Sequence, residues 1–233
     1  MYSIVKSRAH TKSMYMLIAL KKKIYSLLDR VCWGRRWLRV RGIQSYLTGR
    51  GWMRSVSRGI PVTGGDEPIP WYTYPFIDFV GQRVRPDMRV FEYGSGNSTL
   101  WWSQRVAGVD ACEHDSEWLD RFSESVPPNV DYHYSELVRG GEYSKRILSF
   151  TDTFDCIVID GRDRVNCAKN ALQALKDNGV IIWDNSDRSS YEEGYDYLRK
   201  HGFRRIDFWG LGPINDSEWC TSLFYRKDNC FEV

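Results

Sequence analysis

Two short apolar runs in this sequence end in polar side chains that could do chemistry. The runs FDCIVID and GVIIWDN have the composition of buried strands, and they end in Asp160 and in the pair Asp184 and Asn185. Neighbouring parallel strands end at the same edge of a sheet, so we expect these three side chains to converge. Two carboxylates and an amide oxygen suit Mg²⁺, and a carboxylate alone suits a general base.

A second motif, VFEYGSGNST, places two glycines between an apolar strand and a helix. Gly94 and Gly96 allow the backbone to turn sharply and to approach a ligand closely. Glu113 follows nineteen residues after Gly94, at the end of the next predicted strand. A carboxylate in that position can accept both hydroxyl groups of a ribose, so the expected ligand contains a nucleoside.

Two neighbours of the glycine turn distinguish between cofactors. A dinucleotide-binding turn carries a third glycine, and this sequence has Thr99 in that place. Glu92, just before the turn, would repel a pyrophosphate but suits an ammonium group. S-adenosylmethionine is therefore favoured, and a nicotinamide-dependent oxidoreductase is the alternative enzyme.

The elements that must position these motifs follow from the hydrophobic pattern. From residue 89 to residue 202, short apolar strands alternate with amphipathic helices, which is typical of a parallel sheet covered on both faces. The runs FRRIDFW and EWCTSLFYR then predict an antiparallel hairpin. We expect an α/β fold with a doubly wound, mostly parallel seven-stranded sheet. Within it, a helix is predicted over residues 165–179. Residues 49–70, which are rich in Gly and Pro, are predicted to form a linker or a loop over the domain.

The ordered motifs FEYGSGNS, CEHD, FDCIVIDG and GVIIWDN, with the closing hairpin, resemble the class I S-adenosylmethionine-dependent methyltransferases over residues 75–227. The resemblance implies the Rossmann-like methyltransferase fold, S-adenosylmethionine as cofactor and methyl transfer as activity. It also implies a set of cofactor-binding residues. These are Glu92, Gly94, Ser95, Gly96, Asn97 and Ser98 at the methionine and ribose end, Glu113 at the ribose, His114 at the adenine, and Tyr134 and Ser135 beside the adenine.

The Asp and Asp-Asn pattern is similar to that of the cation-dependent O-methyltransferases of the catechol and caffeoyl-CoA type. This resemblance implies Mg²⁺ held by Asp160, Asp184 and Asn185, where it would lower the pKa of an acceptor hydroxyl. The segment after Asp160 lacks the lysine base of that family, so either Asp163 or a metal ligand is expected to assist deprotonation, or no strong base is needed. Without a metal, Asp160 or Asp184 would be the base, and the Asp-Asn pair could also simply cap the turn that follows it.

Charge is divided unevenly along the chain. The 233 residues have a formal net charge of +3, but residues 1–50 hold twelve bases and one acid, which gives +11 there and −8 on the remainder. Residues 11–31 have the spacing of an amphipathic helix. We expect a basic helical extension over 1–48 and a methyltransferase domain over 49–233. The extension would lie on an anionic membrane surface, or pack on the domain or on a second copy in a homodimer.

The remaining composition bears on compartment and substrate. Six scattered cysteines without zinc-type spacing indicate a reducing, cytoplasmic setting, and the apolar run Met14–Leu20 is too short for a membrane span. Aromatic residues near the motifs, together with the basic extension, favour O-methylation of a glycan or glycolipid at the inner face of a membrane, with a phenolic molecule as the alternative. Nucleic acid is disfavoured because no binding motif is recognised. An aminopropyltransferase or a non-catalytic binding protein could share this fold.

Overall fold

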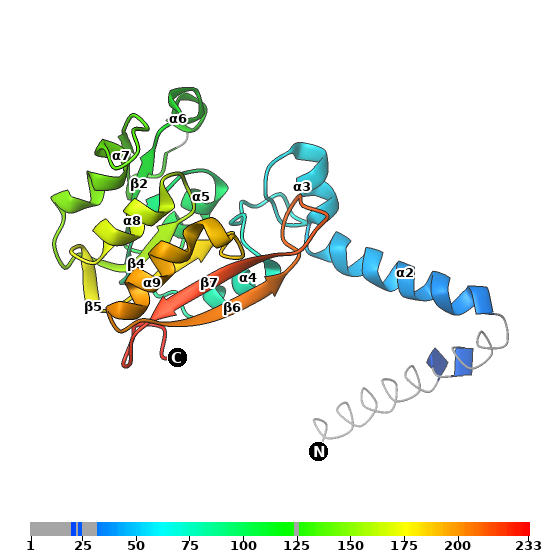
Figure 1. Cartoon of the computed structure of the whole chain (residues 1–233). Coiled ribbons are helices and arrows are strands. Elements are labelled where there is room, and N and C mark those ends of the chain that lie inside the picture. The colour runs from blue at the N-terminus through cyan, green and yellow to red at the C-terminus, as the bar shows by residue number, and fades with distance from the viewer. Residues whose placement is uncertain (1–19, 22, 25–31, 124–125) are drawn as a thin grey trace, which may run out of the picture. The chain divides into compact units, whose positions relative to one another are not determined.

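The computed structural model describes residues 20–21, 23–24, 32–123 and 126–233 (Figure 1). The chain divides into two compact units, Met1–Arg50 and Gly51–Val233. In the first unit, helix α2 spans Cys32–Gly49. The amphipathic helix predicted over residues 11–31 lies outside the described residues, apart from four helical positions. In the described part of the chain, no helix is both long and apolar enough to cross a membrane.

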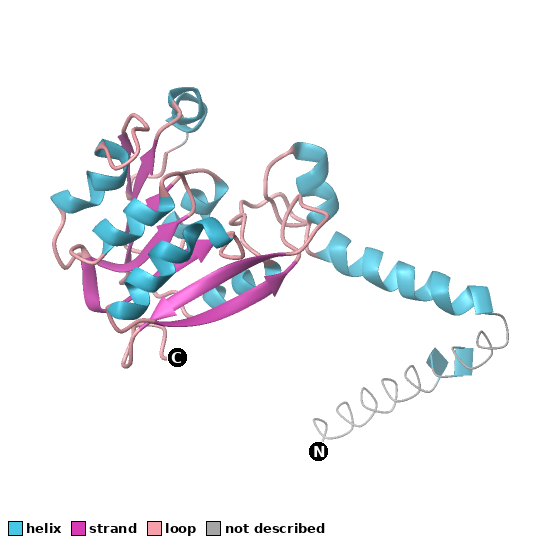
Figure 2. Cartoon of the chain, viewed as in Figure 1, coloured by secondary structure: helices cyan, strands magenta, loops and turns pink. Residues whose placement is uncertain are grey.

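The second unit is built on a seven-stranded sheet with the order β3-β2-β1-β4-β5-β7-β6 (Figure 2). Strand β7 runs antiparallel to β5 and β6, and every other neighbouring pair is parallel. The predicted doubly wound sheet with a closing hairpin is therefore confirmed. The strands are β1 (Arg89–Tyr93), β2 (Gly108–Glu113), β3 (Val130–Tyr134), β4 (Phe154–Ile159), β5 (Leu175–Asp184), β6 (Arg204–Gly210) and β7 (Trp219–Tyr225).

Helices cover both faces of this sheet because alternate strand residues point to opposite sides. On β1, Val90 belongs to one core cluster with Phe76 and Trp102, whereas Phe91 and Tyr93 belong to a second cluster under α7, α8 and α9. The helices are α3 (Trp52–Arg58), α4 (Tyr74–Gly81), α5 (Asn97–Ser103), α6 (Ser116–Ser123), α7 (Glu142–Lys145), α8 (Arg164–Ala171) and α9 (Glu192–Lys200), with 3₁₀ turns at Arg146–Ser149 and Ser189–Tyr191.

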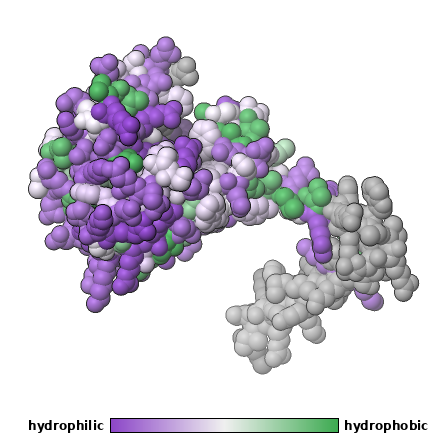
Figure 3. Space-filling view, in the orientation of Figure 1, coloured by the Kyte–Doolittle hydropathy of each residue, from purple (hydrophilic) through white to green (hydrophobic). Residues whose placement is uncertain are grey.

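Most aromatic residues that the sequence places near the motifs are core residues. Tyr72, Tyr74, Trp102 and Trp183 are buried, whereas Trp71 is 41% exposed. Figure 3 shows a mostly hydrophilic surface over this unit, with hydrophobic residues gathered over α3. Of these five aromatic residues, Trp71 alone is therefore placed to offer a ring face to a ligand.

One predicted helix is wrong in its extent. The helix predicted over residues 165–179 ends at Ala171, and Leu175 already begins β5, which bulges before its main run of pairs with β4. Lys176, in the bulge, forms an ion pair of 2.9 Å with Asp155 of β4. Strand pairing therefore overrides the helical pattern there, as tertiary contacts commonly do.

The loop predicted over residues 49–70 contains helix α3. Gly51 and Gly59 flank this helix with φ angles of 82° and 68°, a left-handed conformation that favours glycine. A Cβ atom at Gly51 would lie 2.4 Å from the backbone of Thr63. These glycines begin and end a helix rather than form a linker.

Candidate functional site

The turn between β1 and α5 borders a cavity of about 280 Å³ where β1 lies between β2 and β4, the point at which the strand order reverses. Gly94 has a φ angle of 100°, and a Cβ atom there would lie 3.3 Å from the backbone of Gly161. A Cβ atom at Gly161 would lie 1.9 Å from the hydroxyl of Tyr143. Two turns therefore meet backbone to backbone. The lining residues are Gly94, Ser95, Ser98, Glu113, His114, Asp115, Trp118, Asp160, Gly161 and Arg162.

Glu113 is buried at the end of β2, yet it lines this cavity. Its Oε1 atom accepts the backbone N–H groups of His114 and Asp115 at 2.7 and 3.0 Å, and Oε2 accepts the hydroxyl of Ser95 at 2.9 Å. These contacts fix the orientation of the carboxylate. A carboxylate has about four acceptor positions, so capacity is left for a ligand hydroxyl.

Trp118 in α6 forms one wall of the cavity, and sequence analysis did not single it out. Its indole N–H donates to the carbonyl of Ser95 at 2.9 Å. A Cβ atom at Gly96 would lie 3.5 Å from the ring, so this glycine lets Trp118 sit against the turn. The signal that could have found it is an aromatic residue in the first turn of the helix that follows Glu113.

Some predicted cofactor residues lie outside the wall of this cavity. The amide of Asn97 donates to the carbonyl of Pro61 at 2.5 Å, and Tyr134 is 53% exposed at the end of β3. Ser135 is buried, and its N–H donates to the carbonyl of Glu113 at 2.9 Å. The residues placed outside the wall are Glu92, Gly96, Asn97, Tyr134 and Ser135.

Glu92 lies beneath the glycine turn and is 1% exposed. It accepts the hydroxyl of Thr99 at 2.6 Å, and that hydroxyl accepts the N–H of Gly96 at 3.1 Å. Burial raises the pKa of Glu92 to about 7, against the effect of its hydrogen bonds. Thr99, which replaces the third glycine of a dinucleotide-binding turn, therefore links the turn to a buried acid.

A second cavity, of about 320 Å³, lies at the ends of β4 and β5, and we call it the acidic cavity. The structure brings Asp160, Asp184 and Asn185 together in its wall, as expected for residues that follow neighbouring strands. Asp160 also lines the cavity at the glycine turn, so it faces both spaces. The lining residues are Trp71, Asp160, Asp184, Asn185, Arg188 and Asn215.

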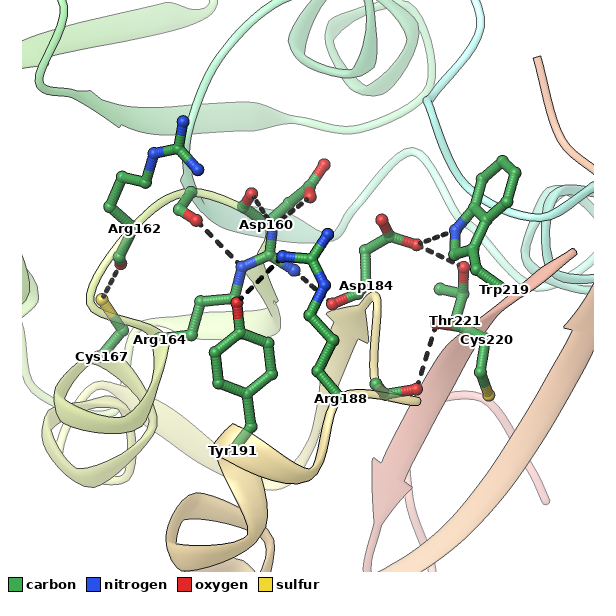
Figure 4. A network of polar contacts seen from close by, with 12 residues as sticks. Asp160, Arg162, Arg164, Cys167, Asp184, Arg188, Tyr191, Trp219, Cys220 and Thr221 are labelled. Carbon is green, nitrogen blue, oxygen red and sulfur yellow. Dashed lines mark hydrogen bonds and ion pairs between the residues drawn. The ribbon is translucent and has the colours of Figure 1, made fainter. Parts of the chain in front are cut away.

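Asp184 is held from β7. Its Oδ1 atom accepts the indole N–H of Trp219 at 3.0 Å and the hydroxyl of Thr221 at 2.6 Å (Figure 4). Burial raises the pKa of Asp184, whereas the charge of Arg164 and these two hydrogen bonds lower it. The antiparallel strand thus orients this acid.

Arg164, at the start of α8, is a site residue that sequence reasoning missed. Its side chain is 6% exposed, and Nε donates to the carbonyl of Gly161 at 2.9 Å. The two Nη atoms donate to the carbonyls of Asp160 and Asp184, and one of them also donates to Oδ1 of Asp160 at 3.1 Å (Figure 4). An arginine four residues after the acid that ends a strand was the available signal. Arg164 therefore ties together the ends of β4 and β5.

The pKa of Asp160 is raised well above the ordinary carboxyl range. Burial is the largest cause, and the charge of Asp184 adds to it, whereas Arg164 opposes both. The side chain of Asp160 is still 24% exposed, so a ligand can reach it. A carboxyl group with a raised pKa that faces two cavities is suited to proton transfer.

These residues do not fit the Mg²⁺ ion that the sequence predicted. The guanidinium of Arg164 lies 3.1 Å from Oδ1 of Asp160, and a fixed cation there repels a divalent ion. Oδ1 of Asp184 already accepts two hydrogen bonds. No group of three His, Cys, Asp or Glu residues that could hold a metal occurs in the described part of the chain. The cation beside the two acids is therefore Arg164.

Asp163, the other predicted base, lies in the wall of a third cavity. Its φ angle is 47°, and it precedes α8. Its carboxylate accepts the N–H of Gly140 at 2.7 Å and the amide of Asn166 at 2.8 Å. It does not line the cavity that holds Asp160 and Asp184, so its position favours a role in holding the loop.

Comparison with known proteins supports the fold. A precorrin-6y C5,15-methyltransferase from Geobacter metallireducens matches with a TM-score of 0.52 and 15% identity, over 66% of this chain and 87% of that one. An rRNA methylase from Streptococcus thermophilus matches with a TM-score of 0.50 and 15% identity, over 66% and 97%. The chain has the fold of the class I S-adenosylmethionine-dependent methyltransferases. This confirms the resemblance in the sequence motifs at the level of the fold.

The remaining comparisons do not identify a function. A spermidine synthase from Thermotoga maritima has a TM-score of 0.49 and 15% identity over 66% of this chain, and the match covers 58% of that protein's length. No protein-family model matches the sequence, and no curated protein matches it either. The function must therefore be argued from the site itself.

Proposed function

We propose that this protein transfers a methyl group from S-adenosylmethionine to a hydroxyl group of an acceptor. The observation that carries the proposal is the position of Asp160, which lines both the cavity at the glycine turn and the acidic cavity. A base between two spaces can take a proton from an acceptor in one while the methyl group approaches from the other.

The first cavity has the features that S-adenosylmethionine requires. Glu113 is fixed to receive ribose hydroxyls, and the close turn at Gly94 lets the ligand approach the backbone. Thr99 stands where a dinucleotide-binding turn has its third glycine, which disfavours a pyrophosphate. The methyltransferase fold supports the same cofactor.

Asp160 and Asp184 have different roles in the proposed reaction. Hydrogen bonds from Trp219 and Thr221 favour the charged form of Asp184, so Asp160 is the acid that takes up the proton. The acceptor oxygen loses its proton to Asp160 as it receives the methyl group, and S-adenosylhomocysteine is left. Arg164 limits the repulsion between the acids throughout, in place of a metal.

The acidic cavity, where the acceptor would bind, favours a sugar, as in a glycan or glycolipid. Trp71 is exposed there, and its indole N–H donates to the amide oxygen of Asn215 at 3.2 Å. Asn185 and Arg188 add further polar groups to the wall. An aromatic face with amide groups at its edge suits a hydroxylated ring.

Titration calorimetry with S-adenosylhomocysteine tests the cofactor, and the release of S-adenosylhomocysteine over a panel of nucleotide sugars and simple glycosides tests the reaction. We expect Asp160→Asn still to bind S-adenosylhomocysteine, with turnover at least about 100-fold slower than in wild type. Asp131→Asn is the matched control and should stay within a few-fold of wild type, because Asp131 is exposed on β3 and lines none of the three cavities. Absence of S-adenosylhomocysteine binding would overturn the proposal.

A further inference from the structure

A third cavity, of about 370 Å³, lies beside the two already described. We call it the arginine pocket. It is formed by the loop after β3, the start of α8 and the 3₁₀ turn before α9. Its lining residues are Leu137, Arg139, Arg162, Asp163, Arg164, Val165, Ser190 and Tyr191.

Two guanidinium groups of this pocket are left for a ligand. The side chains of Arg139 and Arg162 form no hydrogen bond or ion pair within the described part of the chain, and both residues are exposed. Glu193, whose charge acts on Arg139, is already paired with Lys169 at 2.6 Å. These two arginines therefore leave positive charge in the pocket.

The other charged members are occupied. Arg164 donates to the carbonyls at the ends of β4 and β5, and Asp163 accepts the N–H of Gly140 and the amide of Asn166. These hydrogen bonds fix the two side chains but leave their charges in place. Three arginines and one aspartate therefore give the wall a net charge of +2, and Arg139 and Arg162 are the cations free to contact a ligand.

The remaining wall is largely apolar. Leu137, Val165 and Tyr191 contribute hydrocarbon and aromatic surface, and Ser190 contributes a hydroxyl. Apolar surface around a charged group lowers the local dielectric and strengthens its attraction for an opposite charge. The pocket is thus suited to an anionic group.

The arginine pocket borders both parts of the proposed active site. Arg162 lines it and also the cavity at the glycine turn. Arg188 of the acidic cavity donates to the hydroxyl of Tyr191 at 3.4 Å. A ligand in the arginine pocket therefore lies next to the space where the acceptor hydroxyl would be methylated.

We propose that the arginine pocket binds the phosphate group of a phosphorylated acceptor. This rests on the proposed function, because it names the class of molecule that the same site methylates. Two unpaired guanidiniums match the double negative charge of a phosphate better than the single charge of a carboxylate. The acceptor is then a hydroxylated molecule, such as a sugar, that carries phosphate.

The test is titration calorimetry of the full chain with inorganic phosphate, and separately with acetate, at low ionic strength. We expect phosphate to bind, and Arg139→Ala to weaken that binding by about tenfold. Arg204→Ala is the matched control, because Arg204 is exposed on β6 and lines none of the three cavities. The basic N-terminal segment is the same in all three proteins, so its contribution cancels.

Equal phosphate binding by wild type and Arg139→Ala would overturn the proposal, and so would acetate binding as tight as phosphate binding. S-adenosylhomocysteine affinity is measured on the same samples. Arg139 does not line the cavity at the glycine turn, so the variant should keep its affinity for S-adenosylhomocysteine. If no protein binds S-adenosylhomocysteine while phosphate still depends on Arg139, the proposed function fails and the anion site stands.

Discussion

Asp160 and Asp184 end neighbouring strands, but their surroundings differ. Asp184 is buried and accepts two hydrogen bonds from β7, whereas Asp160 faces two cavities. Arg164 contacts both residues and keeps two acids in one site. Neighbouring carboxyl groups titrate as a pair, so a change at one must appear in the titration of the other.

This coupling predicts the pH dependence of the site. Asp160 acts as a base only when ionised, so the rate should rise with pH to a plateau, with a midpoint above the ordinary carboxyl range. Asp184→Asn removes a negative charge that raises the pKa of Asp160, so the midpoint should move to lower pH. Carboxyl ¹³C NMR titration measures it directly. A midpoint that stays in place, or moves up, would contradict the coupling.

The buried carboxyl of Glu92 leads to a prediction about how the stability of the protein depends on pH. Its pKa in the folded protein, about 7, exceeds the ordinary value of 4.5, so the folded state holds more protons between these pH values. Stability should therefore fall as pH rises through that interval. Glu92→Gln removes the charge and should raise the free energy of unfolding at pH 8 by up to about 3 kcal/mol, with little effect near pH 5. Urea unfolding at the two pH values measures this, and an equal effect at both would argue against it.

At the scale of elements, the site depends on where strands end. β4 and β5 are parallel neighbours, and β7 pairs antiparallel with β5. The hydroxyl of Thr221 in β7 donates to Asp184 and so orients its carboxylate. Helix α8 begins just past β4 and brings Arg164 to both strand ends. The first residue of α8, Arg164, therefore supplies a cation beside Asp160 and Asp184, where the sequence pattern predicted Mg²⁺.

The position of Arg164 beside the two acids predicts that removing metal ions leaves the methyl-transfer rate unchanged. Protein treated with EDTA should keep its methyl-transfer rate, because Arg164 already neutralises the acids. Arg164→Gln should slow the reaction and lower the stability, since the contacts to both strand ends are reduced. The measurements are rates with and without EDTA, and thermal melting of the variant. A rate lost in EDTA and restored by Mg²⁺ would show that the ion is needed.

At the scale of the whole molecule, charge separates along the chain. Residues 1–50 carry +11 and the rest of the chain −8. Helix α2 exposes Val40 and Ile43. A basic segment with exposed apolar residues is attracted to anionic lipid surfaces.

Deleting residues 1–48 should therefore weaken binding to phosphatidylglycerol vesicles by about tenfold or more, and raised salt should reproduce the loss. Sedimentation with vesicles measures it, with phosphatidylcholine vesicles as the neutral control. Similar binding by the full chain and the shortened one would assign the segment another role.

Three features could be predicted from the amino-acid sequence alone: the succession of strands along the chain, the glycine turn and the acids at the strand ends. These are local patterns of hydrophobicity and spacing, and each can be recognised without knowing what lies across the fold. The same local patterns predicted a helix over residues 165–179 that is too long, because the pairing of β5 with β4 cannot be recognised within one segment of sequence.

Which side chains contact one another depends on the folded chain. It buried Glu92, placed Trp118 against the turn and separated Asp163 from the other acids. It also set Arg164 between Asp160 and Asp184, which are twenty-four residues apart in the sequence. Burial and long-range contacts determine pKa values and charge balance, and no spacing within one motif encodes them.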